Sequence, residues 1–386
     1  MTSWLEDQLR DALTADAEQI RPETLRPAER VAPRTRTVVP RRRFALAVPL
    51  ASALAVAVIG TVAALLAGTA ATTPAVPATS TLAGPRFLLT AGNDGVTVHD
   101  ARTGKITSRL DLPPTPQGSF REPGGYLLAG AGDGATFYVA QSVESRETQV
   151  SSTRFYRARV DAQGRAAELV RDVIPEVTGT TASSLAVTND GTRLAYSLDG
   201  KVCGQGKTLR FCPGAQLRVV DLPTGTTRTW TTNAAEHIES LSWAADRRTL
   251  GLVVKSEARV LDTTASGTTL AAGQAVAPGT EATTATISPD GRSLLIGHTQ
   301  PPRYTVDEYS VPDGRKIRTL VSRSRDGKSM ARWNMLRYDA TGRHLLLSAN
   351  TEPLSRLDDG RITPLIRPGT PDPQLLGSPS EIQAAW

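Results

Sequence analysis

Side chains that most often carry chemistry are scarce in this sequence. Its 386 residues include two cysteines and four histidines, and only 5% of the residues are aromatic. A structural zinc site needs four ligands, and two cysteines without a nearby histidine cannot supply them. The sequence also lacks a G-x-S-x-G elbow, an H-E-x-x-H pair and a Walker loop. We therefore expect no metal site, no cofactor and no catalytic residue.

One glycine-rich run has nucleotide-binding spacing but the wrong continuation. GAGDGA at 130–135 is followed by TFYVAQSV, which is typical of a strand. A dinucleotide site needs a helix there, because the N-terminus of the helix binds the pyrophosphate. We predict a turn at 130–135. The region after residue 86 also has no convincing long amphipathic helix, which disfavours an α/β hydrolase or a nucleotide-binding fold.

Other candidate polar residues are scattered along the chain. The histidines lie in separate repeats and at different registers, which favours structural or surface roles over a shared site: His99, His237, His298 and His344. Three aspartates precede glycine and could line a calcium-binding rim, but an aspartate in such a turn already has a structural role: Asp133, Asp190 and Asp290.

Positive charge is concentrated ahead of one long apolar segment. The net charge is +6, and Arg41, Arg42 and Arg43 end a basic stretch without acidic residues. The next segment, 44–66, has no charged residue and as a helix would span roughly 35 Å, enough for a hydrocarbon core of about 30 Å. We predict one transmembrane helix, with the lipid bilayer and not a nucleic acid as the partner of these arginines. A cleaved signal peptide is the alternative, but the apolar run is too long for one.

The position of these arginines predicts the topology. Residues 1–43 are expected in the cytoplasm, and the C-terminal part of the chain is expected outside the cell membrane. Segment 67–85 is small, uncharged and proline-containing, and is predicted to be a flexible spacer. Residues 86–386 form the predicted extracytoplasmic domain.

The cytoplasmic tail contains one helical pattern. Ser3 and Glu6 have the spacing of a capping box, and apolar residues at helical spacing continue to Ile20. We predict a short amphipathic helix that binds a cytoplasmic protein or the membrane surface, followed by an extended basic linker at 22–43. A mostly disordered tail is the alternative, because a helix of this length has no core of its own.

The outer domain consists of repeats. Two strands joined by a tight turn recur as SLAVTNDGTRLAYSL (184–198), SLSWAADRRTLGLVV (240–254), TATISPDGRSLLIGH (284–298) and NMLRYDATGRHLLLS (334–348), with a looser copy at 125–141. Third and fourth strands are expected after the copies, in QLRVVDLPTGTTRTW (216–230), ARVLDTTASGTTL (258–270) and TVDEYSVPDGRKIRTL (305–320). Four half-buried strands per repeat of roughly 40 to 57 residues predict an all-β fold, the β-propeller.

The two ends of this domain complement each other. Segment 84–113 has only the later strands of a repeat, and the C-terminal IQAAW reads as the missing first strand. We predict that Ile382 and Trp386 join the segment around Phe87 and close the ring, since a closed ring leaves no free sheet edge. The blades are then expected at 86–112 with 381–386, 125–172, 183–230, 238–272, 283–321 and 334–366. Six blades are favoured, and a seventh between the second and third repeats stays possible.

The turn sequence resembles that of a known family. ISPDGRSLLI at 287–296 resembles the WD40-like repeats of TolB-type propellers, and the layout is similar to that of single-pass bacterial membrane proteins with an outer propeller. The resemblance implies a fold and not an activity, because propellers host many functions. A short tail before one span also resembles the layout of membrane anti-sigma factors, whose zinc ligands are absent here. The paired Gly-His and Trp-Asp signature of true WD40 repeats is absent, so the tryptophans are expected to pack between blades: Trp230, Trp243, Trp333 and Trp386.

These features favour a non-enzymatic module that binds a protein or small-molecule ligand outside the membrane, with a role in signalling or regulation. One alternative is an extracytoplasmic hydrolase or lactonase, which would need carboxylates or histidines converging at the channel mouth. The other alternative is a structural protein of the cell envelope.

Cys203 and Cys212 are close in sequence, in DGKVCGQGKTLRFCPG. They lie in the part of the chain expected outside the membrane, where disulfides persist. A hairpin would bring them together, and a disulfide closing a loop of about ten residues would stabilise the fold by about 2–3 kcal/mol. We predict a disulfide, with two free thiols as the alternative.

We expect thiol-specific labelling of native cells to fail at both cysteines until a reductant is added, because a disulfide has no free thiol. Mass spectrometry of the labelled peptides measures this. Labelling without reductant would refute the disulfide.

Overall fold

The described part of the chain is the repeat domain. In the computed structural model, the described residues are 84–92, 95–115, 117–148, 150–198, 202–203, 210–211, 214–232, 237–300, 302–324, 332–349, 352–366 and 383–386. They lie within the second of two compact units, Pro77–Trp386. The predicted tail, the predicted span at 44–66 and the flanking Arg41, Arg42 and Arg43 lie outside the described residues. No helix among the described residues is long and apolar enough to cross a membrane.

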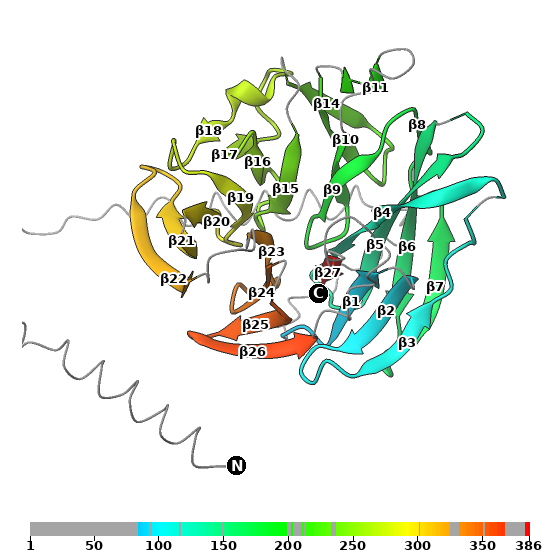
Figure 1. Ribbon diagram of the computed structural model, residues 1–386, viewed down its shortest axis with the longest axis horizontal. Coiled ribbons are helices and arrows are strands. Elements are labelled where there is room, and N and C mark those ends of the chain that lie inside the picture. Colours follow the sequence, from blue (N-terminus) through cyan, green and yellow to red (C-terminus); the bar gives the residue numbers. More distant parts are fainter. Residues whose placement is uncertain are drawn as a thin grey trace, which may run out of the picture. The chain divides into compact units, whose positions relative to one another are not determined.

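Six antiparallel sheets surround a central channel, and each forms one blade (Figure 1). Blade 1 contains β1 (Phe87–Gly92), β2 (Gly95–Asp100), β3 (Ile106–Leu110) and β27 (Gln383–Ala385). Blade 2 contains β4 (Ser119–Gly130), β5 (Thr136–Ser145), β6 (Ser151–Val160) and β7 (Ala166–Arg171), with β8 (Val177–Thr178) beside β6. Blade 3 contains β9 (Ala182–Val187), β10 (Arg193–Leu198), β13 (Gln216–Asp221) and β14 (Thr227–Thr231), and a separate hairpin pairs β11 (Val202–Cys203) with β12 (Arg210–Phe211).

The remaining three blades follow in chain order. Blade 4 contains β15 (Ile238–Trp243), β16 (Thr249–Val254), β17 (Glu257–Asp262) and β18 (Gln274–Ala275). Blade 5 contains β19 (Ala282–Ile287), β20 (Ser293–Gln300), β21 (Arg303–Ser310) and β22 (Lys316–Ser324). Blade 6 contains β23 (Trp333–Tyr338), β24 (His344–Ala349), β25 (Leu354–Asp358) and β26 (Arg361–Ile366). The six-bladed, all-β prediction is therefore confirmed for the part of the chain that the structure describes, which contains no seventh blade.

The strand prediction for the fourth repeat is partly wrong. Segment 258–270 was expected to hold a third and a fourth strand, but after β17 it forms no further strand, and the fourth strand is β18, beyond the short helix η2 (Leu270–Ala272). The Arg228 guanidinium donates hydrogen bonds to the carbonyls of Thr263 and Gly267 at 2.7 and 3.1 Å. These bonds tie the segment to blade 3 and leave its carbonyls unavailable for a strand pair.

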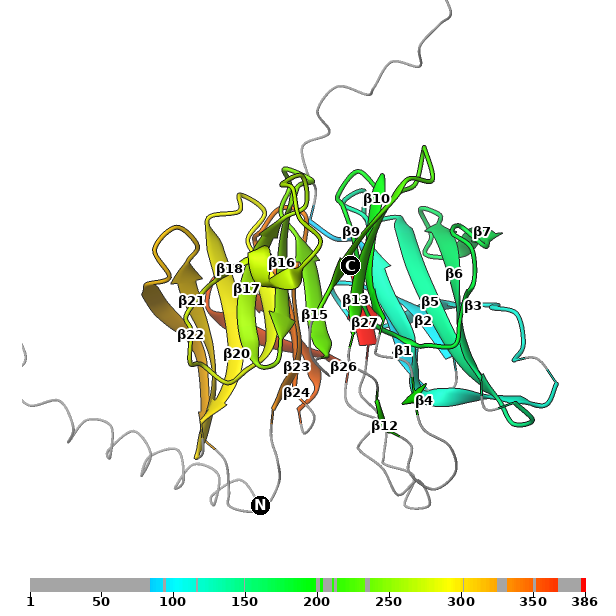
Figure 2. The same ribbon diagram turned by 90° about the horizontal axis from the view of Figure 1, so that it is seen from above.

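The C-terminal strand completes blade 1. β27 pairs antiparallel with β1, in the register Leu89 to Ala385 and Ala91 to Gln383. Phe87 itself pairs on the other side of β1, with Asp100 of β2. Ile382 lies outside the described residues. Figure 2 shows β27 beside β1, although the two strands are almost 300 residues apart in the sequence.

The core is distributed between the blades. Six clusters of buried apolar side chains occur, and each combines residues from two neighbouring blades. Trp230 and Trp333 are almost completely buried, in the clusters between blades 3 and 4 and between blades 5 and 6. Trp386 is also buried, between blades 6 and 1. Because every cluster needs both of its blades, the ring must close for all six to be covered.

The close contact between blades 1 and 2 generates a prediction. A Cβ added to Gly130 would lie 1.5 Å from the carbonyl oxygen of Trp386, whereas a Cβ added to Gly92 would meet no atom within 4 Å. We expect Gly130→Ala to displace the end of β27 and to destabilise the fold by about 3 kcal/mol, the upper end for overpacking. Gly92→Ala is the matched control and should unfold like the wild type. Thermal unfolding followed by circular dichroism measures both, and equal melting of the two variants would contradict the close contact.

Candidate binding sites on the turn face

One face of the propeller is built from short turns. In each antiparallel blade, the turn between the first and second strands lies at the same end as the turn between the third and fourth strands. We call this end the turn face. In blades 2 to 6 an aspartate sits in or beside the first turn: Asp133, Asp190, Asp246, Asp290 and Asp339.

These aspartates stabilise their own turns. The carboxylate of Asp133 accepts hydrogen bonds from the N–H groups of Ala135 and Thr136 at 2.9 and 2.8 Å. Asp290 accepts from the Ser288 hydroxyl at 2.6 Å and from the Arg292 N–H at 3.0 Å. Across the described ranges, no group of three His, Cys, Asp or Glu side chains could hold a metal ion. The hydrogen bonds therefore assign Asp133 and Asp290 to their own turns.

Asp190 also connects two blades. Its carboxylate accepts a hydrogen bond from Arg247 of blade 4 at 2.8 Å, in addition to bonds from Thr188 and Thr192 in its own turn. Burial raises the pKa of Asp190, but the hydrogen bonds from Thr188, Arg247 and Thr192 outweigh it and lower that pKa to about 2. Asp190 is thus a negative charge at neutral pH, and the charge of Arg247 compensates it.

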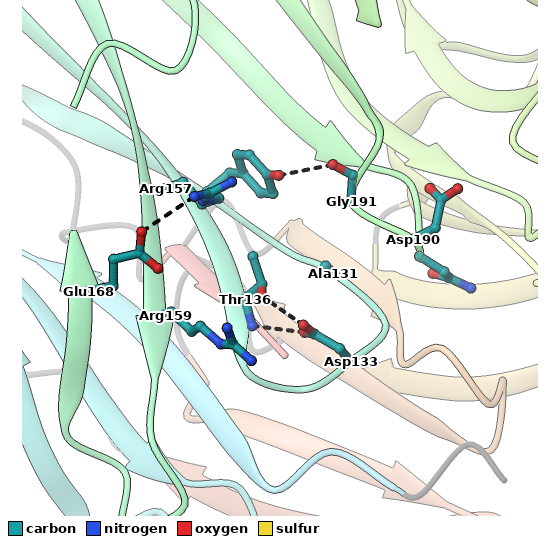
Figure 3. A pocket seen from close by; sticks show the side chains of 10 residues that line it. Ala131, Asp133, Thr136, Arg157, Arg159, Glu168, Asp190 and Gly191 are labelled. Atoms are coloured by element: carbon teal, nitrogen blue, oxygen red, sulfur yellow. Dashed lines mark hydrogen bonds and ion pairs between the residues drawn. The ribbon is translucent and has the colours of Figure 1, made fainter. Parts of the chain in front are cut away.

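A cavity of about 330 Å³ lies between blades 2 and 3 on this face (Figure 3). We call it the groove. Its walls come from the first turns of both blades and from the outer strands of blade 2, and its lining is mostly polar: Ala131, Asp133, Thr136, Tyr138, Arg157, Arg159, Glu168, Asn189, Asp190 and Gly191. This volume is at the lower end of the range for small-ligand sites, about 300–1,000 Å³.

The charges in the groove are unevenly compensated. Arg157 forms an ion pair with Glu168 at 3.4 Å, and both side chains are more than 40% exposed. Arg159 is exposed and has no hydrogen bond or ion pair with the residues that the structure describes. The Tyr138 hydroxyl donates to the carbonyl of Gly191 at 2.9 Å, and burial raises the pKa of Tyr138. The groove therefore offers a free guanidinium beside an exposed ion pair, which suits a polar partner with a negative group.

The inner strands of the blades line the central channel with unpaired edges. Side chains of neighbouring blades satisfy part of these edges. The N–H groups of Ala285 and Ile287 donate to the hydroxyls of Ser240 and Ser242 at 3.0 and 2.9 Å. These bonds fix β19 of blade 5 against β15 of blade 4.

Arg337 of β23 reaches across the channel. Its guanidinium donates to the carbonyl of Leu128 in β4 at 2.6 Å and to that of Leu185 in β9 at 3.4 Å. The Trp386 indole N–H donates to the carbonyl of Arg337 at 3.2 Å. Arg337 is half-buried, and its burial lowers its pKa to about 10. It therefore remains a cation at neutral pH.

Three of the described histidines contact residues of their own blades. The ring of His99 contacts the hydroxyl of Thr90 at 2.8 Å inside blade 1. His298 contacts Asp307 at 2.6 Å inside blade 5, and both are buried. His344 contacts Asp358 inside blade 6. Each of these histidines serves its own blade.

The sequence-predicted site residues lie in three different places. Phe87 and Trp386 are buried on the two sides of blade 1. Cys203 lies in β11, opposite Arg210, whereas Cys212 lies outside the described residues, so the disulfide stays a prediction. The GAGDGA segment forms the expected turn before β5.

Sequence reasoning missed Arg337 and Arg159. For Arg337 a signal existed: alignment of the repeats on their first turns places Arg337 opposite small residues, namely Ala129, Ala186, Ser242 and Thr286. Arg159 had no comparable signal, because the groove exists only where two blades meet.

The comparisons with known proteins show similarity of fold only. No protein family and no curated protein matches the sequence. Solved structures with similar folds include the periplasmic gluconolactonase PpgL of Pseudomonas aeruginosa, at 16% identity and a TM-score of 0.44, covering 72% of this chain and 80% of that one. TolB from Acinetobacter baumannii matches at 12% identity and a TM-score of 0.48, covering 78% of this chain and 65% of that one. The Swd1 propeller domain of Myceliophteria thermophila matches at 13% identity and a TM-score of 0.37, covering 70% and 73%.

The interblade bond of Asp190 generates a prediction. We expect Asp190→Asn to destabilise the fold at neutral pH by about 1 kcal/mol more than Asp290→Asn, after allowance for solvent screening, because only Asp190 binds an arginine of the next blade. Since the folded-state pKa of Asp190 is lowered, this stabilisation is present above the unfolded value near 4 and is lost as the pH falls toward 2.

Urea unfolding at pH 7 and near pH 2 measures the effect. The wild type should lose its advantage over Asp190→Asn at the lower pH. An equal loss of stability in the two variants at pH 7 would show that the contact with Arg247 contributes nothing.

Proposed function

We propose that this protein is a membrane-tethered binding module whose propeller lies outside the cytoplasm and receives a polar partner on its turn face. The observation that carries the proposal is the groove between blades 2 and 3, where the unpaired guanidinium of Arg159 lies beside the exposed pair of Arg157 and Glu168. An acidic group of a protein or small ligand could bind Arg159 without displacing an existing contact.

The tether rests on the sequence of the N-terminal part. Segment 44–66 is long and apolar enough to span a bilayer, and Arg41, Arg42 and Arg43 on its N-terminal side favour a cytoplasmic tail. In this arrangement the amphipathic pattern at 3–20 would bind a cytoplasmic partner. A binding event outside and a partner inside would make the chain a signalling or regulatory component.

We propose binding and not catalysis, because the described carboxylate at the channel mouth, Asp339, is already engaged in its own turn. A hydrolase or lactonase would need a carboxylate or a histidine free to act as a general base. The Asp339 carboxylate instead accepts hydrogen bonds from Thr341, Arg343 and His344 in its own turn. The described histidines with known contacts are bound within their blades.

Site-specific photocrosslinking in intact cells tests the proposal. A photoreactive residue in place of Glu168, an exposed residue that lines the groove, leaves Arg159 intact and should form a discrete adduct with a partner exposed outside the membrane. The matched control replaces Arg292, which is also exposed and on the turn face but lies in blade 5, outside the groove.

An adduct at position 168 that is absent at 292 supports a partner bound in the groove. Equal adducts at both positions, or no adduct at 168, would count against the groove. Adducts with cytoplasmic proteins alone would contradict the proposed topology, and a purely structural protein would give adducts only with envelope polymers.

A further inference from the structure

A ring of small side chains surrounds the channel mouth, and one arginine interrupts it. The third residue before the first turn is Ala129, Ala186, Ser242 and Thr286 in blades 2 to 5. All four line the same cavity in the channel, together with Arg337, which occupies the equivalent position in blade 6. The four small side chains leave space at the mouth of the channel, and the Arg337 guanidinium is the large charged group at this position of the ring.

The charge of Arg337 has no counter-charge among the described residues. Its two hydrogen bonds go to backbone carbonyls, which are neutral acceptors. Burial alone lowers its pKa, with no contribution from a nearby acid. A guanidinium has five N–H donors, so two bonds leave donors free. Withdrawing an uncompensated cation even partly from water is unfavourable, and a bound anion would relieve this.

Trp243 also lines this cavity, and its ring belongs to the apolar cluster between blades 3 and 4. It is only 8% exposed, and its indole N–H has no hydrogen-bond partner and almost no accessible surface. A ligand in the cavity would therefore not bind this nitrogen directly, but the indole lies close enough to the cavity to report on its occupancy. Trp243 belongs to β15 of blade 4 and Arg337 to β23 of blade 6, so the two residues come from different blades of the ring.

The space at the mouth limits the ligand. Two adjoining cavities of about 50 and 60 Å³ share Gly130, Asn189, Arg337, Tyr338 and Asp339. Each exceeds the roughly 10–15 Å³ that one water needs, but both are far below the 300–1,000 Å³ of sites for whole small molecules. The Asp339 carboxylate is buried and holds its own turn with bonds of 2.6, 3.1 and 3.1 Å, so its lone pairs are directed to that turn.

We propose that the channel mouth is an anion site that takes a single carboxylate group, bound to the guanidinium of Arg337 beside Trp243. The carboxylate belongs either to a small free acid or to an acidic residue that a partner inserts into the channel. This site is separate from the groove, and its test is independent of the function proposed above. The competing explanation is that Arg337 has a structural role only and joins β23 to β4 and β9.

Titration of the full chain in detergent solution with acetate tests the site. The neutral isostere acetamide, at the same ionic strength, is the matched control ligand. The readout is the ¹H–¹⁵N signal of the Trp243 indole, assigned with Trp243→Phe. We expect acetate to shift this signal in a saturable manner and acetamide to leave it unchanged. A short peptide with one aspartate distinguishes the sources, since tighter binding of the peptide than of acetate indicates a partner residue and weaker binding indicates a free acid.

Two arginine variants complete the test. Arg337→Gln should weaken acetate binding by about tenfold or more, the loss expected for a charge-assisted hydrogen bond. Arg292→Gln, on the turn face but outside both cavities, should bind acetate like the wild type. If Arg337→Gln fails to fold, the wild-type titration still decides the question, because it needs no variant of that arginine. An indole signal that does not respond to acetate, or that responds equally to acetamide, would overturn the anion site and leave Arg337 with a structural role only.

Discussion

The antiparallel pairing of β27 with β1 is the interaction on which the rest of the propeller depends. Among the described residues before 119, blade 1 has no inner strand of its own, and the C-terminal β27 supplies it. Without that strand, β1 would expose an edge to the channel, and the clusters on both sides of blade 1 would lose Ala384, Ala385 and Trp386. Because the six apolar clusters lie between blades and not within them, the loss of one inner strand would affect the whole ring.

Closure also determines what the channel can hold. Trp386 donates to the backbone of Arg337, and the Arg337 guanidinium donates to blades 2 and 3. The C-terminal residue thus lies next to the one long cation at the ring position where the other repeats have small side chains. Ring closure and the chemistry of the channel mouth are therefore coupled through two hydrogen-bonded residues.

The polar residues of the turn face fall into two groups. Most of its aspartates are fully engaged by backbone N–H groups and hydroxyls of their own turns, as in Asp133 and Asp339, so a rim that looks acidic in sequence offers few free carboxylates. The arginines differ: Arg247 is held by Asp190, whereas Arg159 has no partner among the described residues. The free hydrogen-bonding capacity of this face is therefore mainly that of donors, which is consistent with an anionic or acidic partner.

Local patterns in the sequence determined the blades. Alternating apolar residues and Asp-Gly turns identify individual strands, because side chains of a half-buried strand alternate between core and solvent and because glycine permits the left-handed backbone of Gly191 and Gly291. The incomplete first repeat and the strand-like C-terminus even predicted how the ring closes. The same reasoning failed for 258–270, where a hydrogen-bonding arginine from another blade, and not local propensity, decided the backbone path.

Tertiary structure alone decided the binding surfaces. The groove is formed by β6 and the turns of blades 2 and 3, and the channel mouth by residues of five blades, so no short segment contains either site. Arg337 differed visibly from its equivalents in the other repeats, but its lack of a counter-charge became evident only when the ring placed it against carbonyls more than 150 residues away in sequence. Strand formation depends on neighbours along the chain, which a sequence displays directly. Charge compensation depends on neighbours in space, which only the closed ring defines.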